Sequence, residues 1–413
     1  MVDAAPRGFL TLPGPNDRTV ARLQRKVRLL AVRTLLTAPS TGVGARTARS
    51  LQAARRFLSG VLRDDPEALL RAVGSPDVLP SLLCLQSRAL PPERCFAAIP
   101  GLLARLVALA PEAPLLWEAP IPWLSEGDAG PLHHFDPPAK ALLVRRNELE
   151  LELADGSHAP LPPDSPDGWT RLRPGVDLST LDTNPLSDLE AHPDKDGNAV
   201  DLGGKPLSRW ANALGAALDL VDHLPHWTRE LVASGVRLVP VGYEPERHLS
   251  ASYREAPGTV YLTLHPDPLI LAEAMVHEVQ HGKLNLLTWL DPVLENGHSA
   301  WTTSPVRPDL RPLMGVLLAA HAFVPVAALH HALAVANHPV AGTPTFARRR
   351  AEVLGTNTRS LEILTNLAQP TATGRRILDA LHSTHSALVR AAGGTDLTPP
   401  EPSNGHGDHD GAS

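Results

Sequence analysis

The sequence predicts a mostly helical α+β protein with a metal-binding core made of a short sheet and one long buried helix. Three observations support this class. Apolar residues recur with helical spacing over residues 17–110 and again from Leu207. Short stretches of β-type sequence follow the first helical region. The apolar stretch 269–290 carries the pattern His-Glu-x-x-His, which puts two imidazoles one helical turn apart.

Composition limits the classes of protein to which the chain can belong. With 413 residues it can bury a large core and form two subdomains. Its formal net charge of −6 provides no basic surplus for nucleic acid or an anionic membrane. We expect no apolar run of the ~18 residues that a membrane span needs, and no signal peptide. Cys84 and Cys95 are too few for a disulfide framework, which favours a cytoplasmic protein.

Shifts in composition predict four regions. They are a helical N-terminal region (1–138), a loop-rich part with short strands (139–230), an HExxH metal-binding catalytic core (231–395) and a disordered tail (396–413). Within the first region we interpret residues 111–138 as a Pro-rich connector.

Individual elements follow from local patterns. Strands are expected where apolar residues alternate or cluster between turns, and helices where the spacing is near 3.6. The expected strands are 141–144, 149–153, 236–241 and 258–264, and the expected helices of the core are 207–233, 269–290, 313–336 and two between 341 and 393.

The helix at 269–290 carries the candidate metal site. Asp267 is a suitable N-cap and Pro268 suits the first helical position. Residues four apart share a helix face, so His277 and His281 can bind one divalent metal ion. Glu278 lies beside them and is the predicted catalytic residue.

The context of the motif supports this interpretation. A strand at 258–264 precedes the buried HExxH helix, which is how zincin-like metal sites are built. The alternative is a chance match in a chain with 19 histidines, or two core histidines that bond other groups.

A third metal ligand is expected, because two imidazoles do not hold a catalytic metal alone. His321 is our first choice, because it lies on the second apolar helix, where an imidazole needs a partner. A core histidine bonded to backbone is the competing interpretation. The other candidates that follow the motif are Asp291, Glu295 and His298.

Two further pairs are candidate ligand-binding residues. Ser250 and Ser252 precede the 258–264 strand and are predicted to contact substrate, although serines are also common in turns. Arg311 and Arg307 lie four apart in a Pro-rich segment and form a candidate clamp for the carboxylate of a cosubstrate. The alternative for the arginines is structural pairing with a nearby aspartate.

From Ser250 to Leu333 the sequence resembles the HExxH-motif family of peptide-modification proteins found with ribosomally made natural-product pathways. The stretches that carry the resemblance are HLSASYREAPGTVYLTL, VHEVQHGKLNLL, SPVRPDLRPLMGVLL and AHAFVPVAALH. Val306 departs from the family pattern, which often has Trp there. The resemblance implies an iron- and 2-oxoglutarate-dependent peptide hydroxylase rather than a protease.

The predicted function is therefore hydroxylation of a side chain of a ribosomally made precursor peptide, with Fe(II) and 2-oxoglutarate as cofactors. The alternatives are a zinc metallopeptidase with Glu278 as general base, and a metal-binding peptide-recognition module without catalysis. The expected partner is the precursor peptide, and a homodimer is left open. Both Fe(II) and Zn accept imidazole, so the sequence does not separate them.

Overall fold

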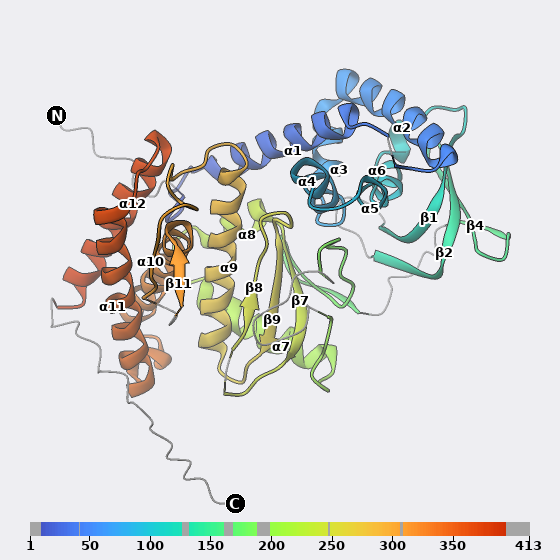
Figure 1. The fold of residues 1–413 in the computed structure, drawn as a ribbon. Helices are drawn as coiled ribbons and strands as arrows, with labels where there is room; N and C mark the ends of the chain where they lie inside the picture. Colours follow the sequence, from blue (N-terminus) through green and yellow to red (C-terminus); the bar gives the residue numbers. More distant parts are fainter. Residues whose placement is uncertain are drawn as a thin grey trace, which may run out of the picture. The chain divides into compact units, whose positions relative to one another are not determined.

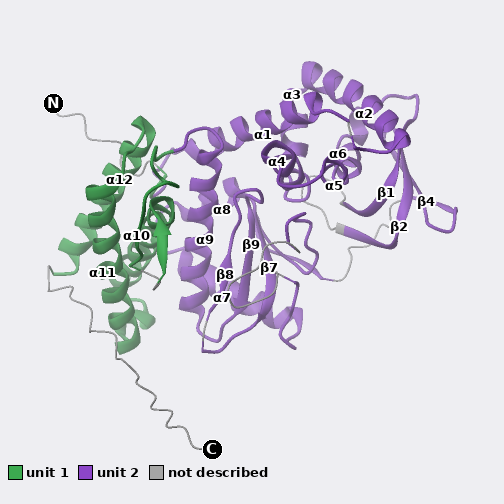
Figure 2. Ribbon diagram, in the orientation of Figure 1, with its two compact units in different colours: residues 1–11, 293–413 green, residues 12–292 purple. Residues whose placement is uncertain are grey.

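The computed structural model describes residues 10–40, 42–125, 132–160, 168–187, 199–246, 248–305 and 309–393. It is a mixed α+β fold with small sheets, as predicted (Figure 1). The chain forms two compact units (Figure 2). Unit 2 is residues 12–292, and unit 1 combines residues 1–11 with 293–413. The division falls after Pro292, inside the range 231–395 predicted as one catalytic core, and the predicted tail 396–413 lies outside the described residues.

Unit 2 begins with helices between residues 19 and 105, as the helical spacing over residues 17–110 predicts. Local signals explain individual starts: the Asp65 carboxylate accepts a hydrogen bond from the Ala68 N–H (3.0 Å), and Pro66 occupies the first helical position. The helices are α1 (Thr19–Thr37), α2 (Ala45–Asp64), α3 (Pro66–Val73), α4 (Leu79–Ser87), α5 (Pro92–Phe96) and α6 (Ile99–Arg105), followed by a 3₁₀ turn, η1 (Val107–Leu109).

The Pro-rich connector predicted at 111–138 is wrong. These residues contribute to an antiparallel sheet of order β1-β2-β3-β4. Its strands are β1 (Leu115–Ser125), β2 (Leu132–Arg145), β3 (Glu148–Glu152) and β4 (His158–Pro160). Pro120 and Pro122 fall where the register of β1 on β2 shifts, and such irregularities are where a strand tolerates a residue without an N–H. Trp117 and Ile121 are buried, which anchors the strand to the core.

A second sheet in unit 2 positions the candidate site. Its order is β5-β6-β7-β9-β8, with β6, β7 and β9 parallel and the edge strands β5 and β8 antiparallel. The strands are β5 (Trp169–Arg173), β6 (Val176–Ser179), β7 (Val236–Tyr243), β8 (Ser250–Ala251) and β9 (Thr259–Leu264). Every residue of β9 is buried, as expected for a central parallel strand covered on both faces.

Three helices accompany this sheet. They are α7 (Leu207–Val221), α8 (Trp227–Ser234) and α9 (Pro268–Thr288). In Figure 1, α9 runs alongside β8 and β9, which agrees with its contacts to both strands. The predicted strands at 236–241 and 258–264 and the predicted helix at 269–290 are confirmed. The helix predicted at 207–233 is two helices, and His226, with a φ of 64°, lies at the break between them.

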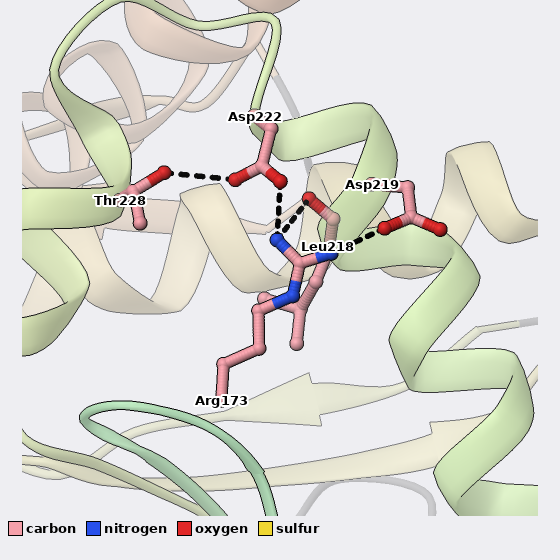
Figure 3. A network of polar contacts seen from close by, with 5 residues as sticks. All are labelled: Arg173, Leu218, Asp219, Asp222 and Thr228. Carbon is pink, nitrogen blue, oxygen red and sulfur yellow. Dashed lines mark hydrogen bonds and ion pairs between the residues drawn. The ribbon is translucent and has the colours of Figure 1, made fainter.

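A polar network fastens the edge of this sheet to α7 (Figure 3). Arg173 at the end of β5 bonds the carboxylates of Asp219 and Asp222, and its Nη1 also donates to the Leu218 carbonyl (3.4 Å). The Thr228 hydroxyl donates to the second oxygen of Asp222 (2.8 Å). The guanidinium charge of Arg173 is therefore matched by two acids.

Unit 1 consists of a small hairpin and three long helices. Its elements are β10 (Trp301–Thr303), β11 (Leu310–Pro312), α10 (Leu313–Val335), η2 (Pro339–Gly342), α11 (Pro344–Leu367) and α12 (Ala372–Ala391). These confirm the helices predicted at 313–336 and between 341 and 393. Asn357 of α11 is fully buried and donates to the Phe323 carbonyl of α10 (3.0 Å), which ties the two helices together.

Helix α10 corrects one expectation from composition. Among the described residues it is the one helix long and apolar enough to cross a membrane, whereas we expected no such run. Of its most apolar 18-residue window, 83% is buried inside the structure, and core helices of soluble proteins pass the same test. Length and composition alone are therefore weak evidence for a membrane span here.

Candidate functional site

Helix α9 begins as its sequence predicts. The Asp267 carboxylate accepts from the Leu269 N–H (2.8 Å), and Pro268 is the first helical residue. Because α9 follows β9 after only three residues, the motif starts from a rigid central strand. Most of the helix is buried, so its position within unit 2 is determined by packing rather than by helix propensity alone.

His277 and His281 lie together on α9. Their ring centroids are 4.3 Å apart and the rings are nearly perpendicular, at 85°. Burial lowers the pKa of His281, and the nearby Glu278 carboxylate opposes this shift only partly. The imidazole is therefore neutral near pH 7, which is the form that binds a metal ion. The Nδ1 atom of His281 is buried, and no described residue hydrogen-bonds to it.

The third metal ligand predicted from the sequence is not assigned by the structure. Within the described ranges, no group of three or more His, Cys, Asp or Glu side chains is arranged to hold a metal ion. His321 is fully buried on α10 and belongs to unit 1, whereas the histidine pair belongs to unit 2. The spacing of the pair fits two ligand positions of a metal site, and the neutral imidazole of His281 suits a metal ligand. The other candidates for the third metal ligand also fall in different units. Asp291 follows α9 in unit 2, whereas Glu295 and His298 are in unit 1.

Glu278 is held by two serines. The Ser250 hydroxyl donates to Oε1 and the Ser252 hydroxyl donates to Oε2, each at 2.7 Å. The carboxylate is only 3% exposed, so these two bonds replace the water that would otherwise solvate it. The sequence predicts a substrate contact for both serines. In the structure their hydroxyl protons face Glu278, which leaves their lone pairs for any further partner.

A second histidine pair lies near this carboxylate. The rings of His248 and His265 meet edge to face, with centroids 6.3 Å apart. Burial, and next the charge of His265, lower the pKa of His248 to about 4, while Glu278 and Glu273 act in the opposite direction. The Nδ1 atom of His248 lies 3.3 Å from Thr263 Oγ1, and its buried Nε2 has no hydrogen-bond partner among the described residues. The spacing of His248 and His265 resembles no metal-binding motif, so the sequence alone does not indicate this pair.

The predicted arginine clamp is only partly visible. Arg307 lies outside the described residues. Arg311 is on β11 in unit 1, where its Nε is 2.8 Å from Asp309 Oδ2. The pairing with a nearby aspartate, which was the alternative from the sequence, is thus what Arg311 shows. Its guanidinium already has a counter-charge.

Unit 2 contains a cavity of about 310 Å³ that reaches Glu278. It lies among the N-terminal helices, the first residues of the parallel strands β6, β7 and β9, and α9. Its walls are rich in cations, although the chain as a whole is acidic. His277 and His281 are not among its described lining residues, so Glu278 is the residue shared by the motif and the cavity. The cations in the lining are Arg28, Arg71, Arg105, Arg171, Arg237 and Lys283.

Lys283 is the one α9 cation in that lining, and it already has a partner. Its Nζ is 2.6 Å from Glu230 Oε1 of α8, and both side chains are nearly inaccessible. The ammonium also lies 5.2 Å from the Trp227 ring centroid. Burial lowers the pKa of Lys283, and Glu230 opposes that shift. The pair therefore fastens α8 to α9 behind the cavity.

No protein-family model matches the chain, and no curated protein matches it. The resemblance to HExxH-motif peptide-modification proteins accordingly stays a prediction from the sequence.

Proposed function

We propose that the protein is an iron- and 2-oxoglutarate-dependent hydroxylase that modifies a side chain of a ribosomally made precursor peptide. The observation that carries this proposal is the engagement of both Glu278 oxygens by Ser250 and Ser252, directly beside the histidine pair. The proposal includes a zincin-like core, since a central parallel strand leads into the HExxH helix with a short antiparallel edge strand at its side.

The hydrogen bonds of Glu278 favour one of the two enzyme chemistries. A zinc peptidase needs this carboxylate as a general base with an oxygen that reaches metal-bound water. Here each oxygen already accepts a short hydrogen bond from a serine, and the group is buried. Such a carboxylate is well suited to orient neighbouring groups, which is the role expected of it in an oxygenase.

The residues of the chain have separate roles in this proposal. His277 and His281 would hold the iron from adjacent turns of α9. When bound, iron and 2-oxoglutarate supply the chemistry in which one atom of O₂ enters a C–H bond and 2-oxoglutarate becomes succinate and CO₂. Glu278 positions the groups around the metal, and Ser250 and Ser252 hold Glu278.

Turnover of the precursor peptide tests the reaction. Anaerobically purified protein with Fe(II), 2-oxoglutarate and then oxygen should give a peptide one oxygen atom heavier, with one succinate per product. A peptide cleaved at an amide bond, formed with zinc and without oxygen, would instead establish the peptidase. Peptide binding with neither product would establish the recognition module.

The serine clamp has its own variants. Ser250→Ala with Ser252→Ala should lower turnover by roughly tenfold or more, because each hydrogen bond to a charged group is worth about 1.5–3 kcal/mol. Metal content should stay unchanged. Ser157→Ala is the matched control, because its hydroxyl also bonds a carboxylate, Asp155 (2.6 Å), at an exposed turn.

Metal analysis tests the histidine pair separately. His277→Ala or His281→Ala should remove most bound iron while the fold survives, because the apolar faces of α9 hold the helix in place. His158→Ala serves as the control, since that side chain is 58% exposed and pairs with Glu150. Full iron occupancy in His281→Ala would contradict the proposed site.

A further inference from the structure

Arg237 is a buried cation without an acid partner. It is the second residue of β7, is 6% exposed and lines the cavity. Its Nη1 donates to Thr183 Oγ1 at 3.3 Å, and its Nε has no hydrogen-bond partner in the described part of the chain. No described carboxylate forms an ion pair with it. The neighbouring Asp177 carboxylate is bonded by Arg171 instead, so the buried Arg237 guanidinium keeps a donor for a further anion.

The sheet register places Arg237 among other cavity residues. Asp177 of β6 and Thr259 of β9 are its partners in the two neighbouring strands, and all three line the cavity. Residues in register on adjacent strands share one face of a sheet. Arg237 therefore lies between two other lining residues, at the end of the sheet that borders the cavity.

The acids around the cavity are engaged elsewhere. Asp77 pairs with Arg105 (2.8 Å), and both side chains are almost completely buried. Asp177 is bonded by Arg171 Nε (2.8 Å) across β5 and β6. Glu278 is bonded by the two serines. Each lining carboxylate has a donor of its own, and none of these donors is Arg237.

Arg28 of α1 is a second, partly buried cation of the cavity lining. Its Nε is buried without a hydrogen-bond partner among the described residues. Burial lowers the pKa of its guanidinium; the charge of Glu67 opposes this, but Glu67 is itself paired with Arg25 (2.8 Å). The guanidinium lies against Gly74, where a Cβ would overlap it. Glycine at this position thus leaves the room that Arg28 occupies beside the cavity.

We propose that this cavity binds an organic anion through a carboxylate that is held by Arg237, with Arg28 as a second cation. A guanidinium fork matches the two oxygens of a carboxylate, and a cavity of about 310 Å³ is within the range of small-ligand sites. The carboxylate belongs either to a free dicarboxylate or to an acidic peptide side chain. The inference concerns binding alone and does not rest on the proposed hydroxylation.

Calorimetric titration of the metal-free, full-length protein tests the proposal without any turnover. The probes are succinate, a short peptide with one central glutamate and blocked ends, and the same peptide with glutamine. Succinate or the glutamate peptide should bind saturably, and Arg237→Ala should weaken that binding by roughly ten- to a hundredfold. Arg237→Lys should restore only part of it, because lysine keeps the charge and loses the fork.

Matched variants make the outcomes decisive. Arg28→Ala should weaken binding less than Arg237→Ala does. Arg209→Ala removes one exposed positive charge of α7 and should leave binding unchanged. Arg237→Met keeps the side-chain volume, so loss of binding with an unchanged melting temperature excludes misfolding as the cause.

Succinate binding that depends on Arg237 would support the site with a free dicarboxylate as ligand. Binding of the glutamate peptide alone, again dependent on Arg237, would support the same site with a peptide as the source of the carboxylate. The proposal is overturned if neither probe binds saturably, if Arg237→Ala binds as well as the parent, or if Arg209→Ala causes an equal loss.

Discussion

Two arginines of the five-stranded sheet, Arg173 and Arg237, differ in burial and in the charge of their partners. Arg173, at the edge in β5, has a 23% exposed side chain and is bonded by two carboxylates and a carbonyl. Arg237, in the central strand β7, is more buried and has one threonine hydroxyl as its partner. The arginine with more access to water thus has the stronger counter-charges. A buried guanidinium without a paired carboxylate is stable where the carboxylate of a ligand can take that place. We therefore assign Arg173 a structural role and Arg237 a role in the proposed anion binding.

The largest expected effect comes from breaking the buried ion pair of Asp77 and Arg105 at the cavity wall. Asp77→Ala should lower the free energy of unfolding by about 3–5 kcal/mol, because it removes the carboxylate that lies 2.8 Å from the buried Arg105 guanidinium. Chemical denaturation measures this. Adding Arg105→Met should recover much of the loss. A cost under about 1 kcal/mol would show that the wall tolerates unpaired cations, which would weaken the argument made for Arg237.

A smaller effect on the free energy of unfolding is expected from a change of pH, because His248 titrates and its buried Nε2 has no hydrogen-bond partner among the described residues. The pKa of His248 is about 4 in the folded protein, below its ordinary value of 6.5, so between these values the unfolded chain binds more protons. Stability should therefore be complete above about pH 6.5 and fall as the pH drops toward 4, by at most about 3 kcal/mol. Denaturation at several pH values, with His248→Gln as the comparison, measures the share of this residue. An equally steep acid loss in that variant would assign the effect to other groups.

The smallest effects belong to the two arginines themselves. Arg173→Ala should cost about 1 kcal/mol and less at high salt, because Asp219 and Asp222 are largely exposed. Arg237→Met should leave the stability of the anion-free protein unchanged or slightly higher, since it removes an unpaired buried charge and keeps the volume. Thermal melts of both variants, with and without succinate, provide the measurement. Arg237→Met losing more stability than Arg173→Ala would reverse the comparison.

The sequence predicts those parts of the fold that depend on local patterns. Helix α9 starts where Asp267 and Pro268 indicate, and β9 lies where its apolar run predicts. The connector at 111–138 was wrong because prolines usually mark loops, whereas here they sit at register shifts of a paired strand. That pairing depends on residues far along the chain, so local composition does not reveal it.

The candidate site shows the same limit. The shared face of His277 and His281 follows from helix geometry alone. The serines were selected by position, but their bonds to Glu278 join residues 26 and 28 apart. No sequence pattern marks Arg237, because its candidate role depends on the fact that the nearby carboxylates are bonded by other residues. Only the folded arrangement shows which acids are already engaged.

The division of the chain has a consequence for its biosynthesis. Unit 2 is one uninterrupted segment, whereas unit 1 joins residues 1–11 to everything after residue 292. Since domains generally fold as units while the chain emerges from the ribosome, unit 2 can fold around its cavity before α10 has emerged. A chain stalled once residue 292 has left the ribosome would therefore carry a folded unit 2 while α10 is still enclosed.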